Sequence, residues 1–434
     1  MIVLADDITG AAEIAGIAFE AGHQVRLVCK NGSAGAGVIE GGSAGVGING
    51  SLCSNTVAAK GTTVIATDTR SMSEMEAAAE TRRITSAISH LPSTIFKKTD
   101  SALRGHVMAE LTALMETTGY QRAVYLPANP SKGRIIKDGT YYVKGPASHH
   151  GEAFILLHET AFSYDPEFPA KTSVLKDRFP GAEAKGIIMP DAESLDDIRH
   201  IVTHYNDGNT LFAGAADLFR EILRTHQTLP QPLPVREGSN YSQGVFTDGR
   251  LSTPLPHREG LGESLLGVGL LGESRLILCG STQSKALDLG IPVAPMPKEV
   301  YDGSNDLSLW DVTAWEQHHS LILTIPYTHP TGKEVAIHLR TVMAEMAKRL
   351  VNNHLLPFLA KGQERGSLII EGGATAWATL QALGWSEFEI VRQYAPGVVQ
   401  MRPIIACGNQ TFRSDNIPLV TLKPGSYPWG GVLG

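Results

Sequence analysis

Short apolar runs alternate with amphipathic segments over the first 145 residues of the chain. The apolar runs predict strands over 2–5, 24–29, 62–66, 94–96 and 123–126. Helical spacing of apolar positions predicts helices over 9–21, 73–90 and 105–117, the second of which opens on a Ser-x-x-Glu capping box. Alternating strands and helices predict an α/β fold with a doubly wound parallel sheet.

A second α/β region begins at Arg275. Its pattern predicts strands over 276–279 and 368–370, and helices over 332–354 and 374–383. A Pro- and Gly-rich stretch, in which PLPVREGS recurs as PLPHREGLGES, precedes it and is interpreted as a linker or insertion. The predicted organisation is an N-terminal domain, the linker and a C-terminal α/β domain, over 1–227, 228–274 and 275–434. Two further stretches, 31–55 and 147–157, interrupt the rhythm of the first domain.

Composition and charge narrow the class of protein. Hydrophobic residues make up 42% and charged residues 19% of 434 positions, and the net charge is −7. These values are typical of a soluble globular protein and give no footprint for bulk nucleic-acid binding. The start MIVLADD carries acids where a signal peptide needs basic residues, and no run of about 18 apolar residues occurs. Four well-separated cysteines without a CxxC pair favour a reducing compartment. We therefore expect a cytoplasmic protein with no membrane or nucleic-acid partner.

Gly-x-Gly-x-x-Gly occurs at 45–50 and again at 267–272. A dinucleotide site needs this motif between a strand and a helix, and neither match has that context because both lie in Gly-rich runs. Neither is assigned, and an NAD-dependent hydroxy-acid dehydrogenase is kept as an alternative function. The histidine pairs at 149–150 and 318–319 are interpreted as surface residues, and no metal ligands are assigned.

Polar side chains follow the predicted strands of the N-terminal domain. In an open parallel sheet, ligands bind beyond the carboxyl ends of the strands. Any one of these side chains could simply cap the next helix, but a mixture of carboxylates and cations fits capping poorly. The candidate site residues at these ends are Asp6, Asp7, Arg70, Lys98, Thr99, Asp100 and Ser101.

This mixture of charges points to a small polyhydroxylated acid as the ligand. Arg70 and Lys98 can hold its carboxylate. Asp7 and Asp100 can accept hydrogen bonds from its hydroxyl groups or abstract a proton. The sequence does not choose between these two aspartates as the catalytic base.

The C-terminal domain has a strand–turn–helix pattern suited to phosphate. Gly372 and Gly373 follow the strand at 368–370, and Ala374 and Thr375 begin the next helix, so free backbone N–H groups and the helix dipole face a ligand. Ser281 and Gly425 follow two further apolar runs and are added to the same site. A small-acid site in one domain and a phosphate site in the other predict a two-domain kinase that closes over its substrates.

Motifs along the chain resemble the four-carbon acid sugar kinase family. They are ADDITGA at Ala5, DTRS at Asp68, KKTDSALRG at Lys97, PANPSKGR at Pro127, ETAFSYDPEFPAKTS at Glu159, PDAESLDDI at Pro190, EGGATA at Glu371 and KPGS at Lys423. The resemblance covers nearly the whole chain outside the three interruptions and is more specific in the first domain. It implies ATP-dependent phosphorylation of the terminal hydroxyl of a tetronate, such as threonate, erythronate or a 3-oxo-tetronate.

The resemblance also implies which residues bind the two substrates. Asp7, Arg70 and the segment 98–101 would contact the sugar acid, while Ser281, the turn 372–375 and Gly425 would hold ATP. Mg²⁺ is expected as well, because the charge of the polyphosphate must be neutralised during transfer.

Some positions depart from the family pattern. His106 stands where the family usually has Asn, AGAADL from Ala213 replaces a Gly-Ser-Ala-Gly type of turn, and GSYPWGG from Gly425 replaces a Gly-Gly-Phe-Gly stretch. The last departure keeps a non-catalytic sensor of small acids as a second alternative. The tetronate isomer, the roles of the three interruptions and the oligomeric state, a homodimer included, are left open.

Overall fold

The computed structural model describes residues 1–30, 61–91, 93–145, 154–165, 167–228, 274–280, 289–327, 332–360, 366–407, 410–412 and 417–425. Both Gly-x-Gly-x-x-Gly matches, Ser281 and most of the three interruptions lie outside the described residues. We call residues 1–228 the N-terminal half and residues 274–425 the C-terminal half.

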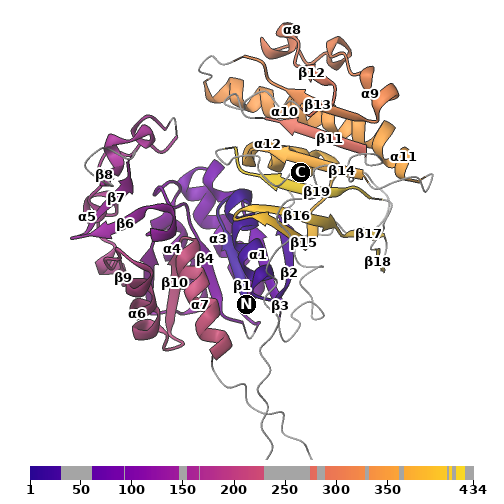
Figure 1. Cartoon of the computed structure of the whole chain (residues 1–434). Coiled ribbons are helices and arrows are strands. Elements are labelled where there is room, and N and C mark those ends of the chain that lie inside the picture. Colours follow the sequence, from indigo (N-terminus) through magenta and orange to yellow (C-terminus); the bar gives the residue numbers. More distant parts are fainter. Residues whose placement is uncertain are drawn as a thin grey trace, which may run out of the picture.

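One sheet of 14 strands runs through both halves (Figure 1). The N-terminal half contributes the order β2-β3-β1-β4-β10-β5-β9 and the C-terminal half the order β12-β13-β11-β14-β19, with parallel neighbours in both. The strands of the N-terminal half are β1 Ile2–Ala5, β2 Gln24–Cys29, β3 Gly61–Ala66, β4 Ile95–Lys98, β5 Arg122–Leu126, β9 Ile187–Ile188 and β10 Thr210–Gly214. Those of the C-terminal half are β11 Ser274–Cys279, β12 Val293–Pro295, β13 Ser320–Thr324, β14 Gly366–Glu371 and β19 Leu419–Lys423.

A β-hairpin joins the two halves. Its strands are β15 Glu387–Ala395 and β16 Val398–Pro403. β15 pairs antiparallel with β2, and β16 pairs antiparallel with β19. Because each hairpin strand is bonded to a different half, the sheet is continuous from β12 to β9.

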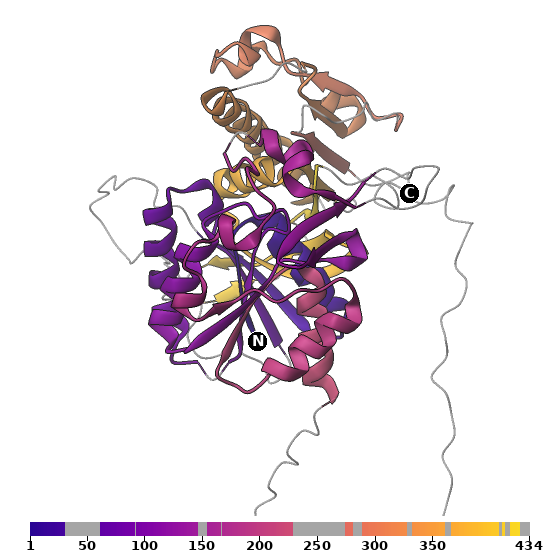
Figure 2. The ribbon, with the colours of Figure 1, turned by 90° about the vertical axis from the view of Figure 1, so that its left-hand side faces the viewer.

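Helices cover both faces of the N-terminal strands (Figure 2). α3 packs on α4, while α1 and α6 pack on α7. The longer helices are α1 Ile8–Glu20, α3 Glu74–Ile88, α4 Val107–Thr118, α6 Leu195–Tyr205, α7 Ala216–Thr228, α10 Lys333–Leu350 and α12 Gly373–Leu383, and the shorter ones are α5 Leu175–Arg178, α8 Lys298–Tyr301, α9 Ala314–His318 and α11 Leu356–Ala360. The predicted capping box of α3 is present, with Ser73 N donating to Glu76 over 2.9 Å and Glu76 N donating to the Ser73 hydroxyl over 3.4 Å.

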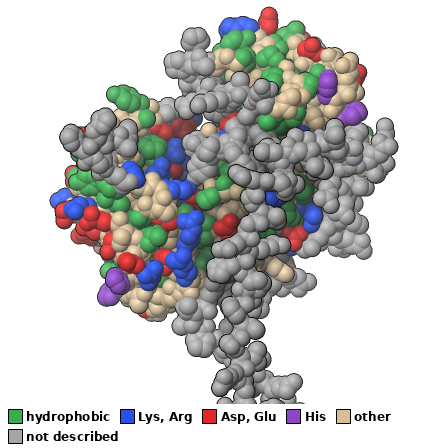
Figure 3. All heavy atoms as spheres, viewed as in Figure 1, with side chains coloured by type: hydrophobic (Ala, Val, Ile, Leu, Met, Phe, Trp, Pro, Cys, Tyr) green, Lys and Arg blue, Asp and Glu red, His purple; other side chains and the backbone are tan. Residues whose placement is uncertain are grey.

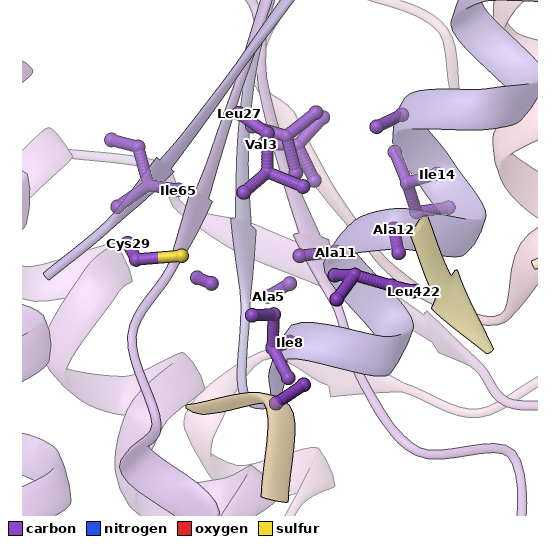
Figure 4. Close-up of a cluster of buried hydrophobic side chains, with 14 of the residues drawn as sticks. Val3, Ala5, Ile8, Ala11, Ala12, Ile14, Leu27, Cys29, Ile65 and Leu422 are labelled. Atoms are coloured by element: carbon purple, nitrogen blue, oxygen red, sulfur yellow. The ribbon is translucent and has the colours of Figure 1, made fainter. Parts of the chain in front are cut away.

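The apolar core crosses the boundary between the halves. Ile8, Ala11 and Ala12 of α1 pack beside Leu422 of β19, in one cluster with Leu27 of β2 (Figure 4). α1 also contacts the hairpin and α12. Small alanine side chains let this helix lie close to strands on both sides, so α1 is a shared structural element of the two halves.

The α/β fold predicted from the pattern is confirmed, and each strand predicted in the first 145 residues agrees with an observed strand to within two residues at either end. Three features differ. β10 lies between β4 and β5 in the sheet. A small antiparallel sheet is formed by β6 Arg134–Lys137, β7 Thr140–Lys144 and β8 Phe154–Leu156. The helix predicted over 332–354 is α10, which is followed by a π-helical turn at Val351–Leu355 and then by α11. β8 falls in the stretch 147–157, which shows no strand pattern in sequence. A second small sheet pairs β17 Ile405–Cys407 with β18 Gln410–Phe412.

Candidate active site

The carboxyl ends of three neighbouring strands bring most of the predicted substrate residues together. Ala5 at the end of β1 is level with both Ala66 of β3 and Lys98 of β4. The residues that follow border a cavity of about 160 Å³, which we call the first cavity. It is lined by Asp7, Thr9, Gly10, Glu13, Arg70, Lys98, Asp100, Ser101, Arg104, Lys132, Arg134, Gly397 and Pro424. Asp6 and Thr99 are buried but do not line this cavity.

Arg70 is held by carboxylates rather than left open to a ligand. Its Nε and Nη2 donate to the two oxygens of Asp6 over 2.9 and 3.0 Å, and its Nη1 donates to Asp7 over 3.1 Å. Burial alone would lower the pKa of Arg70, but the carboxylates of Asp6 and Asp7 raise it well above its usual value. Arg70 therefore stays charged, and its main role is to hold the side chains of Asp6 and Asp7 in place.

Asp7 has a structural role and also faces the cavity. It is the N-cap of α1, accepting from Gly10 N over 2.8 Å and from the hydroxyl of Thr9. Burial would raise the pKa of Asp7, but Arg70 and Lys98 outweigh it and lower the pKa below the usual range. The carboxylate is thus ionised at neutral pH, as a hydrogen-bond acceptor for a substrate hydroxyl must be.

The carboxylate of Asp100 accepts hydrogen bonds on both of its oxygens. Arg104 donates to both of its oxygens, over 3.0 and 2.9 Å, and Ala102 N donates to it over 2.9 Å. Burial would raise the pKa of Asp100, but Arg70 and Arg104 lower it far below the usual range. An aspartate this strongly stabilised as the anion is a weak proton acceptor.

The sequence left four charged residues of the first cavity unassigned: Glu13, Arg104, Lys132 and Arg134. The last three follow the fourth and fifth predicted strands, at the edge of the sheet where ligands are expected. Glu13 reaches in from α1, where Lys132 donates to it and Lys98 lies 3.6 Å away. Burial would raise the pKa of Glu13, but the two lysines lower it. One signal was visible, because Glu13 is a charged residue within an Ala- and Ile-rich helix.

The lining of the first cavity carries more positive than negative charge. Five cations, Arg70, Lys98, Arg104, Lys132 and Arg134, face three carboxylates, Asp7, Glu13 and Asp100. Figure 3 shows Lys and Arg side chains gathered in a column on the N-terminal half in that view. The surplus of two positive charges suits an anionic ligand.

A second cavity, of about 370 Å³, lies between the N-terminus of α1 and the N-terminus of α12. Five residues border both cavities, so the two adjoin: Asp7, Thr9, Arg70, Arg104 and Pro424. The other lining residues of the second cavity are Ile8, Asp68, Ser71, Glu167, Arg340, Gly373, Ala374, Trp377 and Gly425.

The predicted glycine turn forms one wall of the second cavity. Gly372 is the N-cap of α12 with φ +94°, a conformation that favours glycine, and its N–H donates to the Lys423 carbonyl over 2.9 Å. Beneath the turn, Lys423 and Glu371 form a buried ion pair of 2.6 Å. Gly373 lies so close to α1 that a Cβ there would be 2.8 Å from the Thr9 side chain.

The predicted nucleotide residues fall into three groups. Gly373, Ala374 and Gly425 line the second cavity. Gly372 and Thr375 do not, and Thr375 is buried against Gly280 of the β11 end. Ser281 lies outside the described residues.

The described residues contain neither a preformed metal site nor a membrane-spanning helix. No group of three or more His, Cys, Asp or Glu side chains there is arranged to hold a metal ion. No helix within those ranges is long and apolar enough to cross a membrane.

Comparisons with known proteins relate the N-terminal segment to a sugar-binding domain and the whole chain to a sugar-acid kinase. Residues 1–181 match the family of the sugar-binding N-terminal domain, and this segment contains all lining residues of the first cavity except Gly397 and Pro424. The chain is 24% identical over 431 residues to a 3-oxo-tetronate kinase of Brucella melitensis, covering 93% of this chain and 89% of that protein. The chain is therefore similar to the four-carbon acid sugar kinase family that its motifs resemble.

Other similar proteins cover less of the chain or are less identical to it. A D-threonate kinase of Salmonella typhimurium is 35% identical over 79 residues, which is 18% of this chain and 16% of that protein. Two crystal structures share the fold at 16% identity. One is Haemophilus influenzae protein HI1011, with a TM-score of 0.57 and coverage of 99% and 97% of the two chains. The other is a putative tRNA synthase from Salmonella typhimurium, with a TM-score of 0.61 and coverage of 98% and 96%.

Proposed function

We propose that this protein is an ATP-dependent kinase that phosphorylates the terminal hydroxyl of a four-carbon sugar acid. The observation that carries the proposal is the junction of the two cavities. A cationic cavity in the sugar-binding segment adjoins a cavity walled by the glycine turn of α12, and Asp7 borders both. The names of the two curated relatives, a 3-oxo-tetronate kinase and a D-threonate kinase, support the same class of substrate.

The substrate carboxylate would be held by Lys98 and Arg134 rather than by Arg70. Arg70 already has carboxylate partners on Nε, Nη1 and Nη2. The Arg134 guanidinium donates to the Ser101 hydroxyl and lies 5.5 Å from the centre of the Phe162 ring, which fixes its plane. A planar guanidinium held in this way can make a bidentate bond to a carboxylate.

Asp7 would orient the reacting hydroxyl. It borders both cavities, whereas Asp100 borders the first alone and is saturated by Arg104. Phosphoryl transfer depends on positioning and charge stabilisation, so an ionised carboxylate that accepts the hydroxyl proton suffices. Of the two aspartates that the sequence leaves open, Asp7 is therefore the proposed one.

The nucleotide phosphates would lie in the second cavity, against Gly373 and Ala374. The first N–H groups of α12 have no partners within the helix and, with the helix dipole, favour anions. Bound Mg²⁺ would neutralise the charge of the polyphosphate. Ser281 and Gly425 stay predictions for the nucleotide, as does the cytoplasmic location in which ATP is available.

The test is a coupled ADP-release assay with Mg-ATP against threonate, erythronate and 3-oxo-tetronate isomers. Turnover with one isomer would establish the kinase and identify its substrate. If ATP binds but no isomer is turned over, the enzyme acts on a different sugar acid or is a sensor. Failure to bind ATP would overturn the proposal.

A further inference from the structure

Asp68 is a cavity residue that the proposed reaction has not used. It follows β3, just before the 3₁₀ turn Thr69–Ser71, and its backbone has φ +54° and ψ +25°. A non-glycine residue in the left-handed region costs energy and is kept where the surroundings demand it, often at functional sites. Asp68 lines the second cavity, as do Gly373 and Ala374.

The carboxylate of Asp68 is poorly neutralised. Within the described ranges it forms no ion pair, and its polar side-chain partner there is the Ser71 hydroxyl, which donates over 2.7 Å. The other two carboxylates of the second cavity do have cations, since Asp7 pairs with Arg70 over 3.1 Å and Glu167 lies 3.5 Å from Lys333.

The pKa of Asp68 also indicates that positive charge is lacking around its carboxylate. Burial raises the pKa of Asp68 to about 6, and the negative Asp7 adds to the rise. Arg340 of α10 and Lys30, which is paired with Glu80 over 3.2 Å, oppose the rise but do not cancel it. A carboxylate in this setting is stabilised by any further cation that comes beside it.

We propose that Asp68 is a ligand of the divalent cation that accompanies the nucleotide phosphates. Mg²⁺ is usually held by one or two carboxylates together with substrate phosphates and water, so a site need not be a cage of protein ligands. A cation here would lie between Asp68 and phosphates bound at the α12 N-terminus, and would supply the missing positive charge. The inference rests on the proposed function, because it requires a nucleotide in the second cavity.

The test uses Mn²⁺ with ADP, because Mn²⁺ takes the same oxygen ligands and its free form is measured by electron paramagnetic resonance. Three proteins are compared: the wild type, Asp68→Asn and Asp138→Asn. Asp138 is a matched control, because it is also a left-handed aspartate, with φ +47°, but is exposed in the turn between β6 and β7. Asparagine tolerates the left-handed region, so neither change should disturb the backbone.

We expect Asp68→Asn to bind Mn²⁺ in the presence of ADP at least about tenfold more weakly than the wild type, and Asp138→Asn to match the wild type. Binding of ADP in EDTA, measured by calorimetry, should be the same in all three. Equal Mn²⁺ affinity in the two variants would overturn the inference alone, as would loss of metal-free ADP binding in Asp68→Asn, which would show a structural role. Absence of ADP binding in the wild type would instead overturn the proposed function.

Discussion

At the scale of single residues, the charged side chains of the site mostly neutralise one another. Arg70 braces Asp6 and Asp7, Arg104 holds Asp100, and Lys132 holds Glu13. Such a preformed network keeps each side chain in one position, so little reorganisation is needed when a substrate binds. Removing one charge of the network leaves a buried partner unpaired, which lowers the stability of the folded protein.

Asp7→Asn tests the assignment of the hydroxyl-orienting residue. We expect kcat to fall by about 10²–10⁴, because the carboxylate that accepts the proton is lost. The fold should survive, since asparagine caps helices about as well as aspartate. Steady-state kinetics on the substrate identified by the isomer panel, together with thermal unfolding, measure both effects. If Asp100→Asn abolishes turnover and Asp7→Asn does not, the two roles are reversed.

Asp68→Asn should stabilise the free protein at neutral pH. The pKa of Asp68 rises from 3.8 to about 6 on folding, so the folded state binds more protons and its stability falls as the pH rises through this window. At pH 7 the variant should unfold with about 1–3 kcal/mol more free energy than the wild type. Urea unfolding at pH 7.5 and pH 4.5 checks this, and a gain that does not shrink at the lower pH would contradict it.

At the scale of elements, the N-termini of α1 and α12 meet at the second cavity, and residues of both line it. Close approach of the two helices depends on Gly373, which leaves room for Thr9. Gly280 has the same function on the other side of the turn, where a Cβ would collide with Thr375. The glycines of this region therefore set the width of the gap in which phosphates would lie.

Gly373→Ala should weaken nucleotide binding by about tenfold or more, because a Cβ pointing at Thr9 would shift the first turn of α12. Gly332→Ala is a matched control at the N-cap of α10, where a Cβ would meet nothing within 4 Å. Calorimetric titration with ADP and Mg²⁺ compares the two variants. Equal affinities would show that the spacing of α1 and α12 does not govern the site.

The sequence predicts elements and strand ends well, because both are local. Periodicity locates β1 to β5, and the rule that ligands bind beyond strand ends brings Asp7, Arg70, Lys98 and Asp100 to one cavity. What it does not contain is strand order. The pairing of β15 with β2 joins segments some 360 residues apart and leaves no local pattern, and neither does the place of β10 beside β4. Lys132 and Arg134 follow β5, which β10 separates from β4, so their distance from Lys98 depends on that strand order.

At the scale of the whole molecule, the two halves form one sheet and share one core. β15 is bonded to β2, Arg26 pairs with Glu387, and Gln381 donates to the Lys30 carbonyl over 2.8 Å. The sequence predicts two domains that close over their substrates. A continuous sheet stiffens the connection between the halves, so any closure would have to come from segments outside it.

Scanning calorimetry should therefore show a single unfolding transition, with calorimetric and van't Hoff enthalpies in agreement. The halves cannot separate without exposing the apolar face of α1 and the edges of β2 and β19. The expression of 1–228 alone gives a second measurement, and we expect that fragment to aggregate. Two resolved transitions, or a folded fragment, would contradict this.

The turn between β15 and β16 bears on which parts of the gene determine substrate preference. Gly397, between β15 and β16, borders the first cavity together with Pro424, although both belong to the C-terminal half. The cavity proposed to hold the sugar acid is thus bordered by two stretches that lie far apart in the gene. In a chimera with the C-terminal half of a relative that uses another substrate, the cavity residues at 397 and 424 would come from that relative. We expect the substrate selectivity of such a chimera to depend on both parent proteins.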